Sequence, residues 1–329
     1  ERILCLSARD GKLPWKVDYA ETHEPIRKWG RGARSTPATD GQRVYCLGIA
    51  GQLTCVEMAT GKVIWQQRLL GPNPRLKGGY GVYSNILLEG DLMIVMRTRS
   101  PAVVAVDKRS GKVVWRALST GEYFGTPTSA VVAGRRQVVV GVRKHMAGLN
   151  PKTGKVLWQH PHPKAIDALL TPVVHRDIVL FRGYGIPSYA FRVSADETGF
   201  HTKNLWTSRE ITPWFNAPAA RAGRLYVVNQ GYRRPFLFCC EMETGNVLWK
   251  FRIRGLHSKV SSWVLVAGDK LLVQVEDGRL ILDRDAGKSF KELGRTTILS
   301  KTAFAMPALV GGRLYARDFS HVVCLQLIP

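Results

Sequence analysis

The amino-acid sequence predicts an all-β fold, a β-propeller of four-stranded antiparallel blades. Three observations predict it. A tryptophan hairpin motif is repeated along the chain, a motif of small residues and proline alternates with it, and short apolar runs broken by turn residues replace helical periodicity. At 329 residues the chain is long enough for one closed all-β domain. We therefore expect a single propeller domain over residues 1–329.

The first motif is a glycine turn followed by two apolar residues and a tryptophan. It reads TGKVIW at 60–65 and returns as DGKLPW (10–15), SGKVVW (110–115), TGKVLW (153–158) and TGNVLW (244–249). Glycine supplies the positive φ that a three-residue hairpin with a bulge requires. A tryptophan at the same place in each outer strand can bury its ring between neighbouring blades and use its indole N–H as a tether. We expect such a structural docking role for Trp15, Trp65, Trp115, Trp158, Trp206 and Trp249, with Phe290 as an imperfect seventh member.

The second motif joins a small-residue and proline segment to a glycine turn and an apolar strand. Clear copies are STPATDGQRVYCL (35–47), NAPAARAGRLYVV (216–228) and AMPALVGGRLYA (305–316). Its anchors recur about every 45 residues, which is the length of one four-stranded propeller blade. In each unit, strand A carries the anchor, strands B and C are apolar runs, and strand D begins at the tryptophan.

The chain ends predict the blade count. The sequence opens with a C strand, RILCLS (2–7), and a D strand at Trp15, and it closes with A, B and C strands but no D strand. It begins with Glu1 rather than Met, directly in strand-like sequence, so we expect amino-terminal strands to be missing and the first blade to be incomplete. We prefer eight blades in the intact protein, because both ends carry a C strand; seven blades follow if the ends share one composite blade.

The net charge indicates which classes of partner the protein could bind. The formal net charge is +23, from 48 Lys plus Arg against 25 Asp plus Glu. The basic residues are spread thinly, and no nucleic-acid motif occurs, so we expect a solvated basic surface and no specific nucleic-acid binding. An anionic surface contact is the alternative. No apolar run reaches the length of a membrane-spanning helix.

The six cysteines leave two pairings open. Cys46 and Cys55 lie in neighbouring strands, where either a cross-strand disulfide or a reduced pair would fit. Cys239 and Cys240 are adjacent, as in a vicinal disulfide. However, Cys239 occupies the same place before its hairpin glycine as Cys55 does, so it is interpreted as a recurrent core residue of strand C.

The repeat motifs resemble the pyrroloquinoline-quinone-type repeat, whose blades end in Thr-Gly-Lys-x-x-Trp. The chain is similar over nearly all its length to bacterial PQQ-binding-like β-propeller repeat proteins of the planctomycete type, including the closing GGRLYARD at 311–318. More distantly it resembles BamB, the propeller lipoprotein of the outer-membrane assembly machinery. The resemblance implies a protein partner or another envelope ligand, and a periplasmic or outer-membrane-associated location.

The resemblance also implies a quinoprotein dehydrogenase as an alternative. Such an enzyme would need a stacked quinone, a Ca²⁺ site with carboxylate and amide oxygens, a catalytic Asp and an Arg. Residues just before the anchors are aromatic and basic, with only Glu122 and Asp167 as acids. We therefore expect no cofactor, no metal site and no catalytic residue, with pyrroloquinoline quinone and Ca²⁺ as the alternative. The predicted binding residues of the face and channel are Trp29, Arg31, Arg34, Tyr80, Tyr83, Tyr123, Asp167, Trp214, Asn216 and His257.

Three functional hypotheses follow. The first is a non-enzymatic binding scaffold of the bacterial envelope that uses the long loops at 18–35 and 69–84, which are rich in the Arg, Trp and Tyr typical of binding hot spots. The second is a quinone-dependent, dehydrogenase-like redox enzyme that uses the central channel. The third is the sensor or scaffold portion of a larger protein. Of these we prefer the scaffold.

Overall fold

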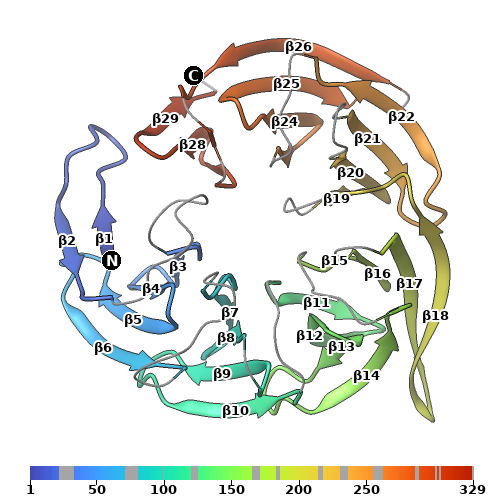
Figure 1. Ribbon diagram of the computed structural model, residues 1–329, viewed down its shortest axis with the longest axis horizontal. Coiled ribbons are helices and arrows are strands. Elements are labelled where there is room, and N and C mark those ends of the chain that lie inside the picture. Colours follow the sequence, from blue (N-terminus) through green and yellow to red (C-terminus); the bar gives the residue numbers. More distant parts are fainter. Residues whose placement is uncertain are drawn as a thin grey trace. The chain divides into compact units, whose positions relative to one another are not determined.

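The strands of the chain confirm the predicted fold class. The computed structural model describes residues 1–21, 33–70, 81–98, 100–119, 125–164, 171–182, 186–213, 218–229, 236–254, 262–285, 289–300, 302–303 and 305–327. These residues contain β-strands and no helix, so no helix in this part of the chain could cross a membrane. The strands pair into six four-stranded sheets, one two-stranded sheet and one three-stranded sheet, each the blade or part-blade of a β-propeller (Figure 1).

The chain divides into two compact units. Unit 1 comprises Glu1–Pro172 and Ala195–His201, and unit 2 comprises Val173–Ser194 and Thr202–Pro329. The two sheets with fewer than four strands belong to different units. They have the predicted strand content: C and D strands at the start of the chain, and A, B and C strands at its end. The preference for eight blades over seven stays a prediction.

Unit 1 holds the two-stranded sheet and three complete blades. The first strand of each blade contacts the first strand of the next, from β3 to β7 and from β7 to β11. The strands are β1 (Arg2–Cys5), β2 (Trp15–Asp18), β3 (Ala38–Thr39), β4 (Arg43–Leu47), β5 (Gln52–Glu57), β6 (Val63–Arg68), β7 (Leu87–Glu89), β8 (Leu92–Met96), β9 (Val103–Asp107), β10 (Val113–Ala117), β11 (Thr128–Val132), β12 (Arg135–Val142), β13 (His145–Leu149) and β14 (Val156–Pro161).

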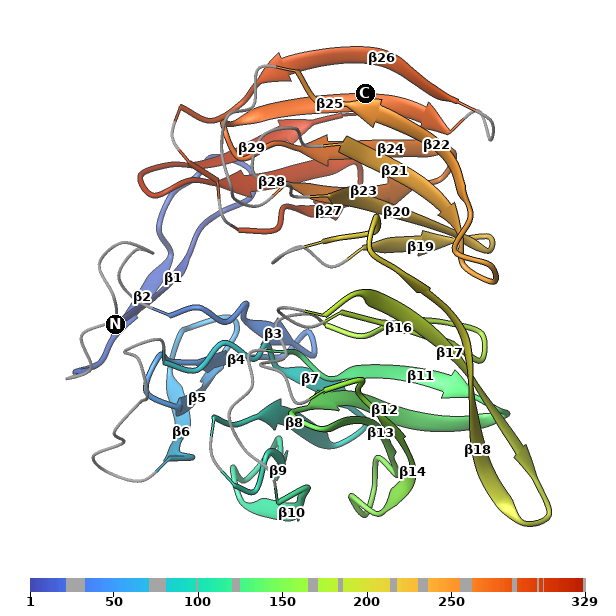
Figure 2. The same ribbon diagram turned by 45° about the vertical axis from the view of Figure 1, so that its right-hand side comes forward.

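Unit 2 repeats the same contact pattern, from β15 to β19 and from β19 to β23. Its first blade includes the long hairpin β17–β18 (Figure 2), whose tip residues Ala195–His201 are counted with unit 1. The strands are β15 (Val173–His175), β16 (Ile178–Phe181), β17 (Ser188–Asp196), β18 (Gly199–Ser208), β19 (Ala219–Arg221), β20 (Arg224–Asn229), β21 (Phe236–Glu241), β22 (Val247–Arg252), β23 (Trp263–Ala267), β24 (Lys270–Gln274), β25 (Arg279–Asp285), β26 (Phe290–Thr297), β27 (Ala308–Val310), β28 (Arg313–Arg317) and β29 (Val322–Gln326).

Burial explains why the middle strands are uniformly apolar. In β8 and β9 nearly every residue is buried, whereas the fourth strand β6 alternates between exposed and half-buried positions. A strand covered on both faces needs apolar side chains at successive positions, whereas a strand covered on one face needs them at every second position. The B and C strands are therefore covered on both faces by neighbouring blades.

The expected bulge occurs in the hairpins before five of the described D strands, namely β6, β10, β14, β22 and β26. The register shifts between Cys55 and Val56 opposite Trp65, and again between Cys239 and Cys240 opposite Trp249. The hairpin glycines have the required positive φ, at 75° for Gly61.

The cysteines are unbridged. Tyr45 pairs with Cys55, and Cys46 pairs with Thr54, so Cys46 and Cys55 lie on opposite faces of their sheet. A disulfide between them would require the two side chains to share a face. Cys239 and Cys240 also form no disulfide, and they enter different core clusters, as successive strand residues do.

Candidate binding site

The tryptophans join each blade to the next through the hairpin glycine. The indole N–H of Trp65 donates to the carbonyl of Lys108 at 3.3 Å, and a Cβ added to Gly111 would come within 2.8 Å of the Trp65 ring. Three further tryptophans repeat both features, with carbonyl acceptors one blade ahead. These pairs are Trp15 with Met58 and Gly61, Trp115 with Pro151 and Gly154, and Trp206 with Met242 and Gly245. This repeated geometry shows that the motif packs one blade on the next. The tryptophan ring occupies the space beside the glycine.

Two tryptophans depart from this hydrogen-bonding pattern. Trp158 donates to Oε1 of Gln137 in its own blade at 2.6 Å. The hairpin one blade ahead, at Asp196–Gly199, is longer, and a Cβ on Gly199 would meet nothing within 4 Å. The Trp249 indole N–H is buried and has no hydrogen-bond partner among the described residues, while its ring packs 5.9 Å from that of Phe290. An interblade tether of the predicted kind is seen at Trp15, Trp65, Trp115 and Trp206, whereas the Trp158 hydrogen bond to Gln137 lies within one blade.

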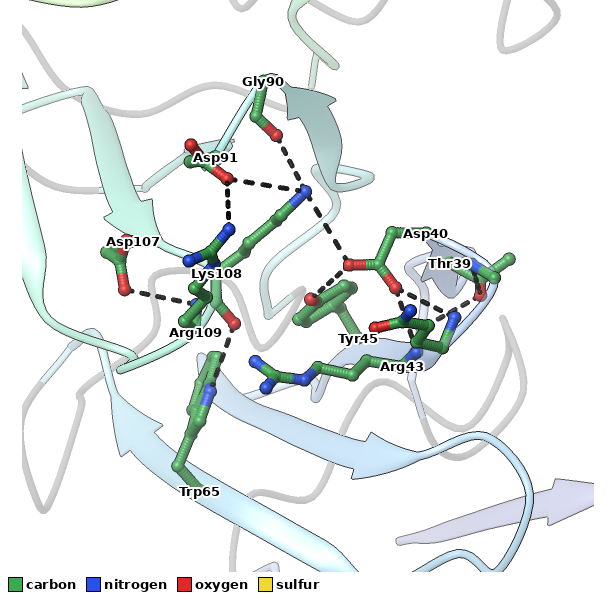
Figure 3. Close-up of polar contacts among 12 residues, drawn as sticks. Thr39, Asp40, Arg43, Tyr45, Trp65, Gly90, Asp91, Asp107, Lys108 and Arg109 are labelled. Carbon is green, nitrogen blue, oxygen red and sulfur yellow. Dashed lines mark hydrogen bonds and ion pairs between the residues drawn. The ribbon is translucent and has the colours of Figure 1, made fainter.

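A polar cluster reinforces the joint between two blades of unit 1 (Figure 3). Asp40 accepts a hydrogen bond from the Tyr45 hydroxyl at 2.9 Å, and Nζ of Lys108 lies 3.7 Å from Asp40 Oδ2. Lys108 also donates to the carbonyl of Gly90 at 3.0 Å. Burial acts to raise the pKa of Asp40, but hydrogen bonds from the Arg43 amide and Tyr45 outweigh it, so that pKa is lowered. The carboxylate is therefore a structural acceptor.

The candidate binding site lies at the entry segments, which we define as the residues just before the first strand of each blade. In unit 1 they form a continuous hydrogen-bonded series. The Thr36 amide donates to Oδ1 of Asn85 at 2.8 Å, and the Asn85 amide donates to Oγ1 of Thr126 at 3.1 Å. Ser35 donates its hydroxyl to the Ser84 carbonyl at 2.6 Å. These bonds hold the bases of the long loops in fixed positions relative to one another.

Sequence reasoning missed the positioning role of Asn85. Its signal was that Asn85 stands at an anchor where most other blades have proline. Proline has no backbone N–H, whereas Asn85 has one and needs an acceptor for it, which Thr126 supplies.

Two of the ten predicted binding residues are described, and they contact each other. The guanidinium carbon of Arg34 lies 5.2 Å from the centroid of the Tyr83 ring. Both side chains are half-buried. This cation–π contact is worth about 0.5–2 kcal/mol, depending on how far it is desolvated. The Arg34–Tyr83 contact joins the carboxyl ends of the loops at 18–35 and 69–84. Consecutive blades therefore contribute to one part of the predicted surface.

The other eight predicted binding residues lie outside the described residues. They are Trp29, Arg31, Tyr80, Tyr123, Asp167, Trp214, Asn216 and His257.

A Ca²⁺–quinone site would need carboxylate and amide oxygens in the entry segments. The Asn85 amide oxygen already accepts from Thr36, and no group of three or more His, Cys, Asp or Glu side chains in the described part of the chain could hold a metal ion. The residues to which the sequence would assign ligand, base and stacking roles, namely Asn216, Asp167 and Trp214, are not described.

Comparison with known proteins identifies the family. The family described as outer membrane protein assembly factor BamB matches residues 1–250 and 192–327, which together cover nearly the whole chain. The chain belongs to this BamB family. Among relatives, BamB of Xanthomonas campestris is 29% identical over 103 residues, which are 29% of this chain and 24% of that protein. Quinoprotein alcohol dehydrogenase PedH of Pseudomonas putida is 27% identical over 202 residues, 56% of this chain and 30% of the enzyme. The matches thus span less than a third of either relative.

Solved structures show the same fold. BamB from Moraxella catarrhalis superposes with a TM-score of 0.68 at 18% identity and covers 95% of this chain and 85% of its own. Quinohemoprotein alcohol dehydrogenase from Comamonas testosteroni has a TM-score of 0.68 at 13% identity, with 95% and 67% covered. At these identities the likeness concerns the BamB-type propeller fold, which the assembly factor and the dehydrogenases share.

Proposed function

We propose that this BamB-family chain is a non-enzymatic scaffold that binds a protein partner through the entry segments and the loops leading into them. The observation that carries the proposal is the Arg34–Tyr83 contact on a hydrogen-bonded base. Arginine and tyrosine are the residue types enriched at binding hot spots, and holding them in place before binding reduces the entropy lost on association. By analogy with the BamB relatives, the proposed partner is a component of outer-membrane protein assembly, and the proposed location is the periplasm or the outer membrane.

Photo-crosslinking in host cells tests this proposal. A photoreactive residue replaces the exposed Ala33, beside Arg34, and adducts are identified by mass spectrometry with and without Arg34→Ala or Tyr83→Ala. We expect one discrete envelope adduct that falls at least tenfold in both variants. Arg135→Ala is the matched control, because Arg135 makes a comparable contact with Phe200, at 5.8 Å, on the distant β17–β18 tip. An adduct unchanged by Arg34→Ala and Tyr83→Ala would reject this surface.

The 202-residue match to PedH supports a second candidate, a quinone-dependent dehydrogenase-like enzyme. Pyrroloquinoline quinone and Ca²⁺ would be added to purified protein, and quinone absorbance and alcohol turnover would be followed. Stoichiometric binding with turnover would favour the enzyme and count against the scaffold. The third candidate, a sensor or scaffold portion of a larger protein, uses the same surface and predicts the same crosslink within a longer polypeptide.

A further inference from the structure

A pocket of unit 2 is lined by four arginines. It has a volume of about 230 Å³ and is lined by residues of β22, of the segment after it, and of β25 and β26. Its lining residues are Phe251, Arg252, Ile253, Arg254, Arg279, Ile281 and Arg295. No carboxylate is among them. We propose that this pocket binds a phosphate group, carried either by a small molecule or by a lipid headgroup.

The apolar residues give the pocket a rigid floor. Ile253 and Ile281 are each 2% exposed, and Phe251 stacks on Phe290 with ring centroids 3.8 Å apart. Ile281 pairs with Arg295 across β25 and β26, which sets the position where the Arg295 backbone enters the pocket. Close packing below the arginines keeps their backbones fixed and lowers the dielectric on one side of the charges.

Arg279 and Arg295 are already oriented by hydrogen bonds. Nε of Arg279 donates to Asp277 at 2.8 Å, and its Nη1 donates to the Arg254 carbonyl at 2.9 Å, which ties β25 to the segment after β22. The Arg295 guanidinium makes a two-point contact with Glu292, at 2.5 and 2.6 Å. These carboxylates each offset one of the two arginine charges.

Arg252 and Arg254 carry the excess charge. Both are exposed, and neither side chain has a hydrogen bond or ion pair with any other described residue. Four guanidinium groups against two carboxylates leave a local excess of two positive charges around one small pocket. A phosphate dianion matches that excess, and guanidinium groups bind phosphate oxygens through paired, charge-assisted hydrogen bonds. The pocket volume is below that usual for drug-sized ligands, which favours a compact phosphate group.

This inference is independent of the proposed scaffold function, because the pocket involves none of the entry segments. The test compares the wild-type protein with the double variant Arg252→Gln/Arg254→Gln. Both changes are on exposed side chains and leave the Arg279 and Arg295 contacts in place. Arg221→Gln, which changes an exposed arginine of β19 in the same unit, controls for the loss of one surface charge outside the pocket. One arm titrates inorganic phosphate by calorimetry at constant ionic strength; the other measures binding to phosphatidylglycerol vesicles, with phosphatidylcholine vesicles as reference.

We expect saturable one-to-one phosphate binding that weakens at least tenfold in the double variant and less than twofold in Arg221→Gln. Phosphate binding of this kind identifies a small-molecule phosphate as a ligand. Vesicle binding alone, lost only in the double variant, identifies a lipid headgroup. Absence of both signals, or equal losses in Arg221→Gln and the double variant, would overturn the proposal, because the effect would then reflect net charge rather than the pocket.

Discussion

The indole N–H of Trp65 and the carbonyl of Lys108 are joined by a 3.3 Å hydrogen bond between consecutive blades, while the Trp65 ring covers Gly111. The pair combines a directional tether with a steric fit that excludes any side chain at position 111. It therefore predicts separate costs for the loss of each feature.

Replacing Gly111 by alanine tests the steric fit. Gly111 has a φ of 74°, and the added Cβ would come within 2.8 Å of the Trp65 ring. We expect a loss of about 2–4 kcal/mol in the free energy of unfolding, because backbone strain and ring displacement add. Gly134→Ala is the control: its φ is 75°, but a Cβ there meets nothing within 4 Å, so only the strain of about 1–2 kcal/mol remains. Urea unfolding measures both, and equal losses would refute the interblade fit.

Replacing tryptophan by phenylalanine tests the tether. Trp65→Phe removes the hydrogen bond to Lys108, and we expect a loss of about 0.5–1.5 kcal/mol. Trp158→Phe should lower the free energy of unfolding more, by about 1–3 kcal/mol. It removes the N–H that donates to Oε1 of Gln137, and the Gln137 side chain is fully buried. The double variant Trp158→Phe/Gln137→Leu, which removes both partners, should recover part of that loss. If the losses of the single variants Trp158→Phe and Gln137→Leu add up to the loss of the double variant, the two groups are not coupled.

His162 predicts a decrease in stability at acid pH. Burial lowers its pKa from 6.5 to about 4, although its contact with the Val142 carbonyl acts to raise it. Between these two values the unfolded chain binds a proton that the folded chain does not. Stability is therefore highest above about pH 6.5 and falls, on the order of 2 kcal/mol, as the pH drops toward 4.

Urea unfolding at pH 7.5 and pH 5 measures this effect. His162→Gln keeps a donor near the Val142 carbonyl but does not titrate, so the difference between the two pH values should shrink. Burial also lowers the pKa of neighbouring His145, so some pH dependence should persist. An unchanged difference in His162→Gln would contradict the assignment.

Thiol reactivity should follow burial. Cys324 is exposed, whereas burial raises the pKa of Cys46 to about 12, of Cys55 to about 11 and of Cys240 to about 12. A thiol reagent at pH 8 should modify Cys324 rapidly and the buried thiols slowly, because the thiolate is the reacting species. In denaturant without reductant, all six cysteines should react. Detection of only four would reveal a disulfide and contradict the structure.

Much of the fold was predictable because repetition exposes it. Each TGK-type turn needs a glycine with positive φ, and each outer strand needs its tryptophan, so the same local requirement recurs at every blade and the strand assignments followed. The binding site was harder to predict from the sequence, because no repeated motif marks its residues. The ten predicted residues stand in stretches of sequence where the copies differ, and the two that the structure describes, Arg34 and Tyr83, contact each other.

Local turn chemistry and strand periodicity specify the four-stranded blades, the bulged hairpins and the positions of the docking tryptophans, because both act within short segments of the chain. Which groups of different strands meet depends on the folded structure. It directed the Trp158 indole to Gln137 within its own blade, set Cys46 and Cys55 on opposite faces, and gathered arginines from β22, β25 and β26 into one pocket. Such contacts depend on strand register and blade packing between residues far apart in the chain, which no local pattern encodes.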